Sequence, residues 1–432
     1  MLGFASTILL GTLVLMTPFA SQSREATDPL TALFTATSAT CVTGLVTVDT
    51  GGHWSTFGEL VILGLIQVGG LGIMSVATLL VMLVGRRLTA SAEVLTGAEA
   101  RSIADRTPGQ VLLGVVRFTL AVELVMALVL IVRLRVAYHS DWGSAVYSGV
   151  FHAISAFNNA GFGLLPDSAV QWAQDPWMCV PLMLSVMIGG LGFPVWWELL
   201  RHWRRPYARW TVHATITIWG SVVLWVVGTV LFAAFEWDNK STLGPMGTGG
   251  KILAAAFQSV VARTAGFNSV DIGALHQESL LLLDGLMFIG GGSAGTAGGV
   301  KVATFAILGF VIWAELRGEP TVRVLNRRLS PANMRQALTV ALLATGMVVA
   351  ATGALMVLTP FRLDVVLFEV ISAFATVGMS TGITADIPAA GQVILVVMMF
   401  LGRIGPITLG AALALRNRPR RYEVPEERVL VG

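Results

Sequence analysis

Long apolar stretches alternate with shorter, partly polar segments along the whole chain. A helix needs roughly 20 apolar residues to cross a hydrocarbon core of ~30 Å. Stretches of that kind occupy residues 3–20, 57–84, 110–134, 176–200, 212–235, 280–312, 334–358 and 391–415. Between the members of each successive pair lies a segment of about 10 to 14 residues, the length of a re-entrant half-helix rather than a span. The pattern predicts eight spans in four units of helix, half-helix with a following strand, and helix.

A glycine closes each of these short segments, and the four glycines are spaced almost evenly. They are Gly44, Gly161, Gly266 and Gly378, separated by 117, 105 and 112 residues. In three copies a phenylalanine lies ten residues and a serine six residues before the glycine; these are Phe34, Phe151, Phe368, Ser38, Ser155 and Ser372. The third copy differs, with Phe257 nine residues before and Val260 six before. A second glycine-rich motif follows after 24 to 28 residues, beginning at Gly69, Gly189, Gly290 and Gly402. Two motifs that recur in one order indicate an internal fourfold repeat.

Composition places the chain in a membrane. Of its 432 residues, 55% are hydrophobic and 12% are charged, whereas soluble domains carry about 25% charged residues. The net charge of +3 is too small to indicate a nucleic-acid partner. Cys41 and Cys179 lie in apolar surroundings and predict neither a disulfide framework nor a zinc site. The first 20 residues lack a basic start and a good cleavage signal, so we expect a retained first helix rather than a secretory leader.

The basic residues indicate how the chain is oriented. If the half-helices enter from outside, the inner segments 85–106, 201–209, 315–335 and 416–432 contain 18 of the 28 lysines and arginines, and the outer segments contain six. Cytoplasmic loops carry an excess of basic residues in multi-pass proteins. We therefore expect a multi-pass protein of the cytoplasmic membrane whose half-helices and glycine strands face the outside.

The glycine strands suit the binding of a bare cation. Non-helical backbone at membrane depth occurs only where protein buries it or where it lines a water-filled cavity. Glycine reaches positive φ without a side-chain clash, which lets consecutive carbonyl groups turn toward one axis. Each half-helix would also aim its negative carbonyl end at that site. Close helix packing explains one such glycine, but four in register favour a pore.

The residues around the four glycines resemble the selectivity filters of the Trk/Ktr/HKT potassium transporters. The similar strings are Thr35-Ala36-Thr37-Ser38-Ala39 with Val42-Thr43-Gly44-Leu45, Phe157-Asn158-Asn159-Ala160-Gly161-Phe162, Arg263-Thr264-Ala265-Gly266-Phe267-Asn268 and Ala375-Thr376-Val377-Gly378. The similarity covers essentially the whole chain. With eight expected spans and no additional amino-terminal pair, the chain is most similar to the pore-forming membrane subunits of Ktr systems.

The resemblance implies an all-α integral membrane protein with four tandem repeats of helix, re-entrant pore loop and helix in a pseudo-fourfold arrangement. The repeats would be residues 1–84, 108–200, 211–313 and 333–415, followed by a cytoplasmic tail at 416–432. It also implies potassium uptake, a homodimer in the membrane and a cytoplasmic nucleotide-binding ring of the RCK type as partner. The implied filter residues, which would bind K⁺, are Val42, Thr43, Gly44, Asn159, Ala160, Gly161, Thr264, Ala265, Gly266, Thr376, Val377 and Gly378.

The first filter carries two further expectations. Gly44 stands where a plant relative of this family can have serine, and the glycine favours potassium over sodium. Cys41 stands where the family pattern has threonine, so a hydroxyl contribution would be lost there while a carbonyl contribution would remain. No resident cofactor is expected, because potassium is the transported ion; sodium is a further candidate as an activator.

Two arginines in the membrane segments need separate explanations, because a charge at bilayer depth costs at least about 2.5–3.5 kcal/mol. Arg403 lies deep in the last span, where a pore-facing positive charge below the filter would raise the barrier to cations. Arg263 adjoins the third filter, and its charge would repel the ion if it faced the axis. We expect Arg263 to point away behind the strand and to pair with a carboxylate, for which Asp49, Asp271 and Glu369 are candidates.

The sixth span contains six glycines within residues 290–299. Each costs roughly 1 kcal/mol in a helix, so the span is expected to be two half-helices joined by a loop. The match to G-x-G-x-x-G is weak, because a dinucleotide site needs a βαβ unit. The loop is either a packing kink or a movable gate, and the resemblance favours a gate formed by Gly290, Gly291, Gly292, Ser293, Gly295, Thr296, Gly298, Gly299, Lys301 and Arg403.

Two other functional classes fit the sequence less well. A symporter that couples potassium stoichiometrically to sodium or protons also uses broken helices, but such transporters usually show two inverted halves rather than four parallel copies. An intramembrane enzyme would need a nucleophile with a base or a metal cluster, and the six histidines fall in different segments without ligand spacing. His152, the one histidine in a half-helix, is expected to pack with a hydrogen bond. The sequence leaves open the coupling ion, the regulatory ligand and the oligomer.

Overall fold

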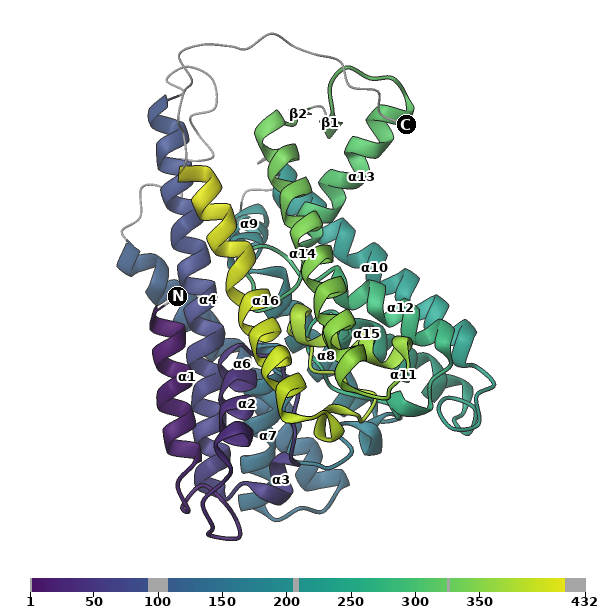
Figure 1. The fold of residues 1–432 in the computed structure, drawn as a ribbon. Helices are drawn as coiled ribbons and strands as arrows, with labels where there is room; N and C mark the ends of the chain where they lie inside the picture. Colours follow the sequence, from purple (N-terminus) through teal and green to yellow (C-terminus); the bar gives the residue numbers. More distant parts are fainter. Residues whose placement is uncertain (1, 92–107, 205–209, 325–326, 416–432) are drawn as a thin grey trace.

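The computed structural model describes residues 2–91, 108–204, 210–324 and 327–415 (Figure 1). The all-α prediction is confirmed, since one pair of two-residue strands is the only sheet in these ranges. The first half of the chain forms α1 (Leu2–Leu15), α2 (Pro29–Thr40), α3 (Thr50–His53), α4 (Thr56–Ser91), α6 (Pro108–Ala137), α7 (Trp142–Phe157), α8 (Pro176–Leu191) and α9 (Phe193–Arg204). The second half forms α10 (Val212–Glu236), α11 (Thr248–Val261), α12 (Gln277–Phe288), α13 (Val302–Leu316), β1 (Arg323–Val324), β2 (Arg327–Arg328), α14 (Pro331–Leu358), α15 (Leu363–Ala375) and α16 (Ala389–Leu415).

Not all of the predicted spans are continuous helices. By length and composition, four helices in the described ranges could cross a membrane: Thr56–Leu79, Gly109–Ala137, Val212–Glu236 and Pro331–Leu358. Helices α8 and α9 form a fifth candidate that is bent by 99°. Shorter apolar helices lie at Leu2–Leu15, Val302–Leu316 and Ala389–Gly405, where the sequence also predicts spans. The number of eight spans therefore stays a prediction, and the expected tail at 416–432 lies outside the described residues.

Helices α2, α7, α11 and α15 are the predicted half-helices, with 12, 16, 14 and 13 residues. The first two begin at aspartate caps: Asp28 accepts hydrogen bonds from the backbone N–H groups of Leu30 and Thr31, and Asp141 accepts one from Ser144. Such caps satisfy N–H groups that have no partner within the helix. The phenylalanine of the repeated motif is fully buried in all four half-helices. It therefore anchors each of them, including the third, where it lies one residue closer to the glycine.

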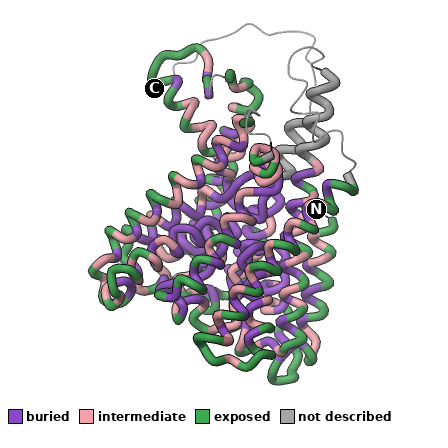
Figure 2. The backbone as a smooth tube through the Cα atoms, turned by 180° about the vertical axis from the view of Figure 1, so that it is seen from behind, coloured by how far each residue is buried: buried purple, intermediate pink, exposed green. Residues whose placement is uncertain are grey.

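The half-helices join neighbouring units into a closed circle. Each contacts the first helix of its own unit: α2 contacts α1, α7 contacts α6, α11 contacts α10 and α15 contacts α14. Each also contacts a helix of the preceding unit: α7 contacts α4, α11 contacts α8, α15 contacts α12, and α2 contacts α16 from the far end of the chain. Figure 2 shows the buried residues gathered in the middle of the molecule. The four half-helix ends are thus held together in the interior.

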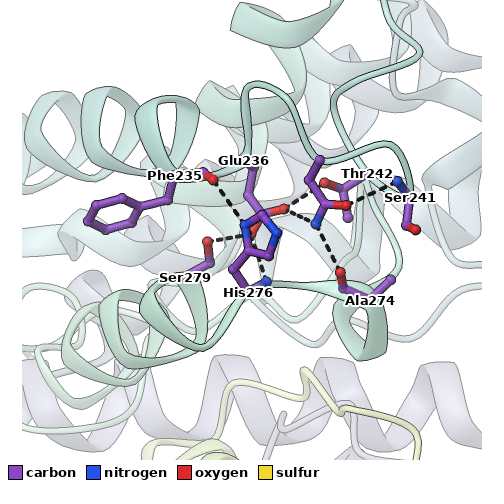
Figure 3. Close-up of polar contacts among 8 residues, drawn as sticks. Phe235, Glu236, Ser241, Thr242, Ala274, His276 and Ser279 are labelled. Carbon is purple, nitrogen blue, oxygen red and sulfur yellow. Dashed lines mark hydrogen bonds and ion pairs between the residues drawn. The ribbon is translucent and has the colours of Figure 1, made fainter.

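A buried carboxylate fixes the segments on both sides of α11 (Figure 3). Glu236, the last residue of α10, is fully buried. It accepts hydrogen bonds from Thr242 Oγ1 at 2.6 Å, Asn239 Nδ2 at 2.7 Å, the backbone N–H of His276 at 2.9 Å and the hydroxyl of Ser279. Four donors to one carboxylate offset the cost of burying its charge. The chain that leads into α11 and the start of α12 are therefore both tied to the end of α10.

Candidate functional site

Each half-helix is followed by a short strand with an unusual backbone. We number its residues backward from the glycine, so that Gly44 is position 0 and Cys41 is position −3. At position −2 the φ angles are 57° for Val42, 59° for Asn159, 77° for Thr264 and 51° for Thr376, and the four glycines at position 0 have φ between 69° and 96°. Three of the residues at −2 are β-branched, for which positive φ is a genuine outlier. Strain repeated at one position in four strands points to a functional requirement.

The four glycines form a closed ring, which we call the glycine ring. A Cβ added to Gly44 would lie 2.3 Å from the carbonyl oxygen of Ala160, and one on Gly161 would lie 2.6 Å from that of Ala265. One on Gly266 would lie 2.2 Å from the oxygen of Val377, and one on Gly378 would lie 2.1 Å from that of Thr43. Each glycine therefore faces the carbonyl at position −1 of the next strand, and the fourth strand returns to the first. Only a residue without a side chain allows four backbones to meet this closely.

The ends of the half-helices hold the strands in this geometry. In the first, second and fourth strands, the backbone N–H at position −1 donates to the carbonyl six residues before the glycine, at 2.8 Å. The Ser38 and Ser372 hydroxyls also accept from the backbone N–H of Gly44 and Gly378, at 3.0 and 3.1 Å. In the third strand the N–H of Ala265 donates to Val261 instead, at 2.8 Å. This shorter connection explains the one-residue displacement of the phenylalanine in the third copy.

The second glycine motif lets a span approach the end of its half-helix. A Cβ added to Gly69 would lie 2.0 Å from the carbonyl oxygen of Thr40. A Cβ on Gly189 would lie 1.9 Å from that of Phe157, and one on Gly402 would lie 1.7 Å from that of Phe374. All three carbonyls are four residues before the ring glycine. In the third copy Gly290 contacts the carbonyl of Gly298 instead. The motif therefore has a packing role in three copies, and the third copy uses it for a different contact.

Residues 289–301 connect α12 and α13 without a helix, and we call this segment the central loop. Its backbone N–H groups at Gly292 and Thr296 donate to the carbonyls of Gly190 and Gly189 on α8, at 2.8 and 3.1 Å. The Thr296 hydroxyl lies 3.2 Å from the carbonyl oxygen of Phe157 and 3.1 Å from Oδ1 of Asn159. The broken span predicted from the glycines is therefore present, and its loop contacts the helix end of the second strand rather than the glycine end.

The other contacts of the central loop reach the fourth strand and the bend in the second unit. A Cβ on Gly298 would lie 2.3 Å from the carbonyl oxygen of Ala375 and 2.0 Å from Oγ1 of Thr376. The carbonyl of Ser293 lies 2.5 Å from where a Cβ on Gly192 would be, and Gly192 is the residue at the α8–α9 bend. The predicted gate residues 290–299 thus sit between the second and fourth strands.

Two cations bind successive carbonyl groups of the central loop. Arg403 is 3% exposed, and its Nη1 donates to the carbonyl oxygen of Thr296. Lys301 Nζ donates to the carbonyls of Ala297 and Gly298, the latter at 3.3 Å. Within the described residues, Nε and Nη2 of Arg403 have no hydrogen-bond partner. The arginine therefore carries unused donors and a nearly buried positive charge beside the strands.

The expectation that Arg263 pairs with a carboxylate is wrong for the part of the chain that the structure describes. Arg263 is 4% exposed and donates from Nη2 to the carbonyl of Gly290 at 2.8 Å and from Nη1 to that of Ser221 at 3.4 Å. Its guanidinium also lies over the ring of Trp225, 5.3 Å from the centroid. Carbonyl dipoles and an aromatic face replace the anion. The side chain connects the third strand to the start of the central loop.

Glu369, one of the suggested partners of Arg263, instead holds the exit of the fourth strand. Its carboxylate accepts from the Ser380 hydroxyl, from the backbone N–H of Thr381 at 3.1 Å and from the Thr384 hydroxyl at 3.1 Å. His152 lies in α7 as expected, is 1% exposed and bonds through Nδ1 to the carbonyl of Ser148 at 2.7 Å. Both residues pack behind the strands.

The sequence interpretation missed Glu123 on α6. This residue is 5% exposed, and its carboxylate accepts hydrogen bonds from Gln67 of α4 and from Asn158, at position −3 of the second strand. It is the single acidic residue in the apolar stretch 110–134. An ionisable side chain inside a span marks a functional position by default, so this signal was available.

The chain is similar to known cation transport proteins. A family model described as "TrkH: Cation transport protein" matches residues 4–417. The chain is 38% identical over 433 residues to the Ktr system potassium uptake protein B of Vibrio alginolyticus, covering 100% of this chain and 94% of the relative. It is 36% identical over 438 residues to the protein of the same name from Bacillus subtilis strain 168, covering 100% and 95%. It is also 32% identical over 439 residues to the potassium/sodium uptake protein NtpJ of Enterococcus hirae, covering 100% and 96%.

A solved structure has the same fold. The crystal structure of the potassium transporter TrkH from Vibrio parahaemolyticus is similar, with a TM-score of 0.69 over 95% of this chain and 84% of that one. The sequence identity is 18%, so this likeness bears on the fold alone.

Proposed function

The chain belongs to the TrkH family of cation transport proteins, and we propose that it mediates potassium uptake across the cytoplasmic membrane through a pore lined by its four glycine strands. Membership makes it a multi-pass membrane protein. Relatives named as potassium uptake proteins support the choice of ion. The observation that carries the proposal is the glycine ring, in which four strained strands meet with each glycine against a carbonyl oxygen of the next.

In this proposal the backbone carbonyls of the strands replace the hydration shell of K⁺. The ligating residues are Val42, Thr43, Gly44, Asn159, Ala160, Gly161, Thr264, Ala265, Gly266, Thr376, Val377 and Gly378. The neutral oxygens are fixed by hydrogen bonds from the strands to the half-helix ends, so they need little reorganisation when an ion enters. The carbonyl ends of α2, α7, α11 and α15 add the negative poles of four helix dipoles.

The central loop acts as the gate in the same proposal. It contacts the helix ends of the second and fourth strands, and Arg403 and Lys301 bind three of its successive carbonyls. An ion leaving the strands would meet both a backbone obstruction and two positive charges. Opening requires the bonds from Thr296 and Gly292 to α8 to break, together with the bond from Arg403. These hydrogen bonds are few, which suits a segment that opens locally.

The remaining elements of the proposal concern organisation. The four repeats are residues 1–84, 108–200, 211–313 and 333–415, with the glycine strands facing outside and the tail 416–432 in the cytoplasm. Two copies form a homodimer, and a cytoplasmic nucleotide-binding ring of the RCK type regulates them; the Ktr system names of two relatives support a multi-component system. The protein carries no resident cofactor, and sodium is a candidate activator.

One relative favours a second candidate function, in which sodium is also carried. The Enterococcus hirae relative is named for potassium and sodium uptake. In a stoichiometrically coupled symporter, uptake would depend on a sodium or proton gradient. In the proposed pore, sodium would compete weakly at the strands without driving the flux.

Flux measurements on purified protein in liposomes test these alternatives. We expect a potassium current whose reversal potential equals the potassium equilibrium potential. That reversal potential should not shift when sodium or proton gradients are imposed. A reversal potential that follows either gradient would instead establish coupling.

Rescue of a host that lacks its own potassium uptake, with and without a co-expressed regulatory subunit, tests the partner. A protein that inserts normally but moves no potassium in either assay would refute the function.

A further inference from the structure

Three side chains form a closed hydrogen-bonded group behind the second glycine strand. Asn158 Nδ2 donates to Gln67 Oε1 at 2.8 Å and to Glu123 Oε1 at 3.0 Å, while Gln67 Nε2 donates to Glu123 Oε2 at 3.0 Å. We call this group the amide–carboxylate triangle. Its members come from α4, from α6 and from the strand itself, so it joins the first unit to the second. Each oxygen of Glu123 has one amide donor.

The triangle is tightly packed against the strand. Asn158 is fully buried and occupies position −3, directly before the left-handed residue Asn159. A Cβ on Gly70 of α4 would lie 1.9 Å from Asn158 Oδ1, so the amide has no room to withdraw in that direction. That oxygen has no hydrogen-bond partner among the described residues. Nδ2 of Asn158 also lies 2.9 Å from the carbonyl oxygen of Ile154, so the position of Asn158 is set by the bonds of Nδ2 to Ile154, Gln67 and Glu123.

Glu123 has no cationic partner in the part of the chain that the structure describes, where the ion pairs lie elsewhere. Each carboxylate oxygen faces an amide N–H donor, so the hydrogen bonds of the triangle are complete without a proton on Glu123. An uncompensated carboxylate inside a span is costly and needs a function to retain it. A cation at the helix end of the strands is the missing partner of opposite sign.

The charges on the other strands reinforce this view. Position −3 is Arg263 in the third strand, and Arg403 and Lys301 bind the central loop, so three cationic side chains lie near the proposed path of the ion. At an effective dielectric constant of about 20, a unit charge roughly 10 Å away changes a cation's binding constant on the order of 10-fold. A fixed negative charge behind the second strand would offset that repulsion.

We propose that Glu123 is a positioning residue that sets the potassium affinity of the filter. It holds a negative charge behind the second strand, where it contacts the side chain of Asn158. The inference rests on the proposed potassium uptake and adds a residue that acts through Asn158 rather than on the ion. The charge, more than the hydrogen bonds, carries the effect. Replacing the carboxylate by an amide should therefore weaken potassium binding, whereas removing the Gln67 amide should not.

The test measures the half-saturating potassium concentration and the maximal uptake rate in cells without other potassium uptake. For Glu123→Gln we expect the half-saturating concentration to rise on the order of 10-fold, with a maximal rate within about 2-fold of wild type. Gln67→Met is the matched control, since it removes one amide of the triangle and leaves the charge. It should change the half-saturating concentration by less than about 2-fold.

Protein amount in the membrane and thermal stability in detergent accompany each variant. If the glutamine variant does not accumulate, the shorter pair Glu123→Asp and Glu123→Asn repeats the comparison with and without charge. An unchanged half-saturating concentration in a normally inserted neutral variant would overturn the inference, as would an equal rise in Gln67→Met. If the wild type takes up potassium normally in those cases, the proposed function still stands. Absence of wild-type uptake would refute both.

Discussion

Replacing Gly378 by alanine tests the glycine ring most directly. Gly378 has φ of +96°, and an added Cβ would lie 2.1 Å from the carbonyl oxygen of Thr43 and 2.8 Å from Cα of Gly44. Ordinary contacts lie between 3.4 and 4 Å. The methyl group therefore overlaps backbone rather than the end of a flexible side chain. The fourth strand must move away from the first, or its backbone must change.

The cost has two parts. A left-handed conformation costs roughly 1–2 kcal/mol in a residue other than glycine. Relieving the overlap requires a displacement of about 1 Å in closely packed backbone, which costs a further 1–3 kcal/mol as overpacking. The same displacement changes the distance between facing carbonyls, on which ion selectivity depends. We therefore expect at least a 10-fold loss of potassium uptake and weaker discrimination against sodium.

The other ring glycines provide a graded series. The corresponding distances are 2.2 Å at Gly266, 2.3 Å at Gly44 and 2.6 Å at Gly161, so alanine should be least damaging at Gly161 and most damaging at Gly378. Gly353 of α14 is the matched control, since no heavy atom lies within 4 Å of its added Cβ. Potassium uptake, sodium inhibition of that uptake and membrane protein amount are measured for all five variants. Wild-type uptake and selectivity in all four ring variants would refute the close meeting of the strands.

Three further variants test the neighbouring features. Arg403→Ala removes a positive charge and the bond to the central loop, so maximal potassium flux should rise; unchanged or lower flux at normal protein amount would contradict the gate. Gly402→Ala places a Cβ 1.7 Å from the Phe374 carbonyl oxygen, so the detergent melting temperature should fall sharply, and a wild-type value would exclude this packing role. Glu236→Gln replaces the carboxylate that accepts four hydrogen bonds with a neutral amide, so the free energy of unfolding should drop by about 2–4 kcal/mol. Ion selectivity should be retained. Lost selectivity at full stability would show that Glu236 acts on the pore.

The arrangement of the elements was predictable because it depends on patterns that repeat. Apolar stretches located the helices, and glycines located the strands and the break between α12 and α13. The ring is closed by contacts between each glycine and the carbonyl at position −1 of the next strand. These contacts could not be read from spacing, since they depend on how four distant strands meet. The α8–α9 bend also follows from tertiary packing, because Gly192 lies against the backbone of the central loop.

The error over Arg263 has a physical origin. A buried arginine usually pairs with an anion, but Arg263 binds two backbone carbonyls and lies over the Trp225 ring instead. Sequence gives no measure of how many carbonyls a broken helix leaves unpaired. The carbonyl of Gly290 is available to Arg263 because the helix is interrupted there. Glu123 stands out in the sequence as the single acidic residue of its span, but its amide partners are 56 and 35 residues away, so spacing does not reveal the triangle.

Because one polypeptide supplies all four quarters of the ring, each quarter can evolve alone. The residues at position −3 are Cys41, Asn158, Arg263 and Ala375. In an assembly of four identical subunits, any substitution there would be multiplied by four, and four guanidinium groups around one axis would repel any cation. In a single chain the four strands can differ, so a substitution at position −3 changes one quarter of the ring and leaves the other three quarters as they are.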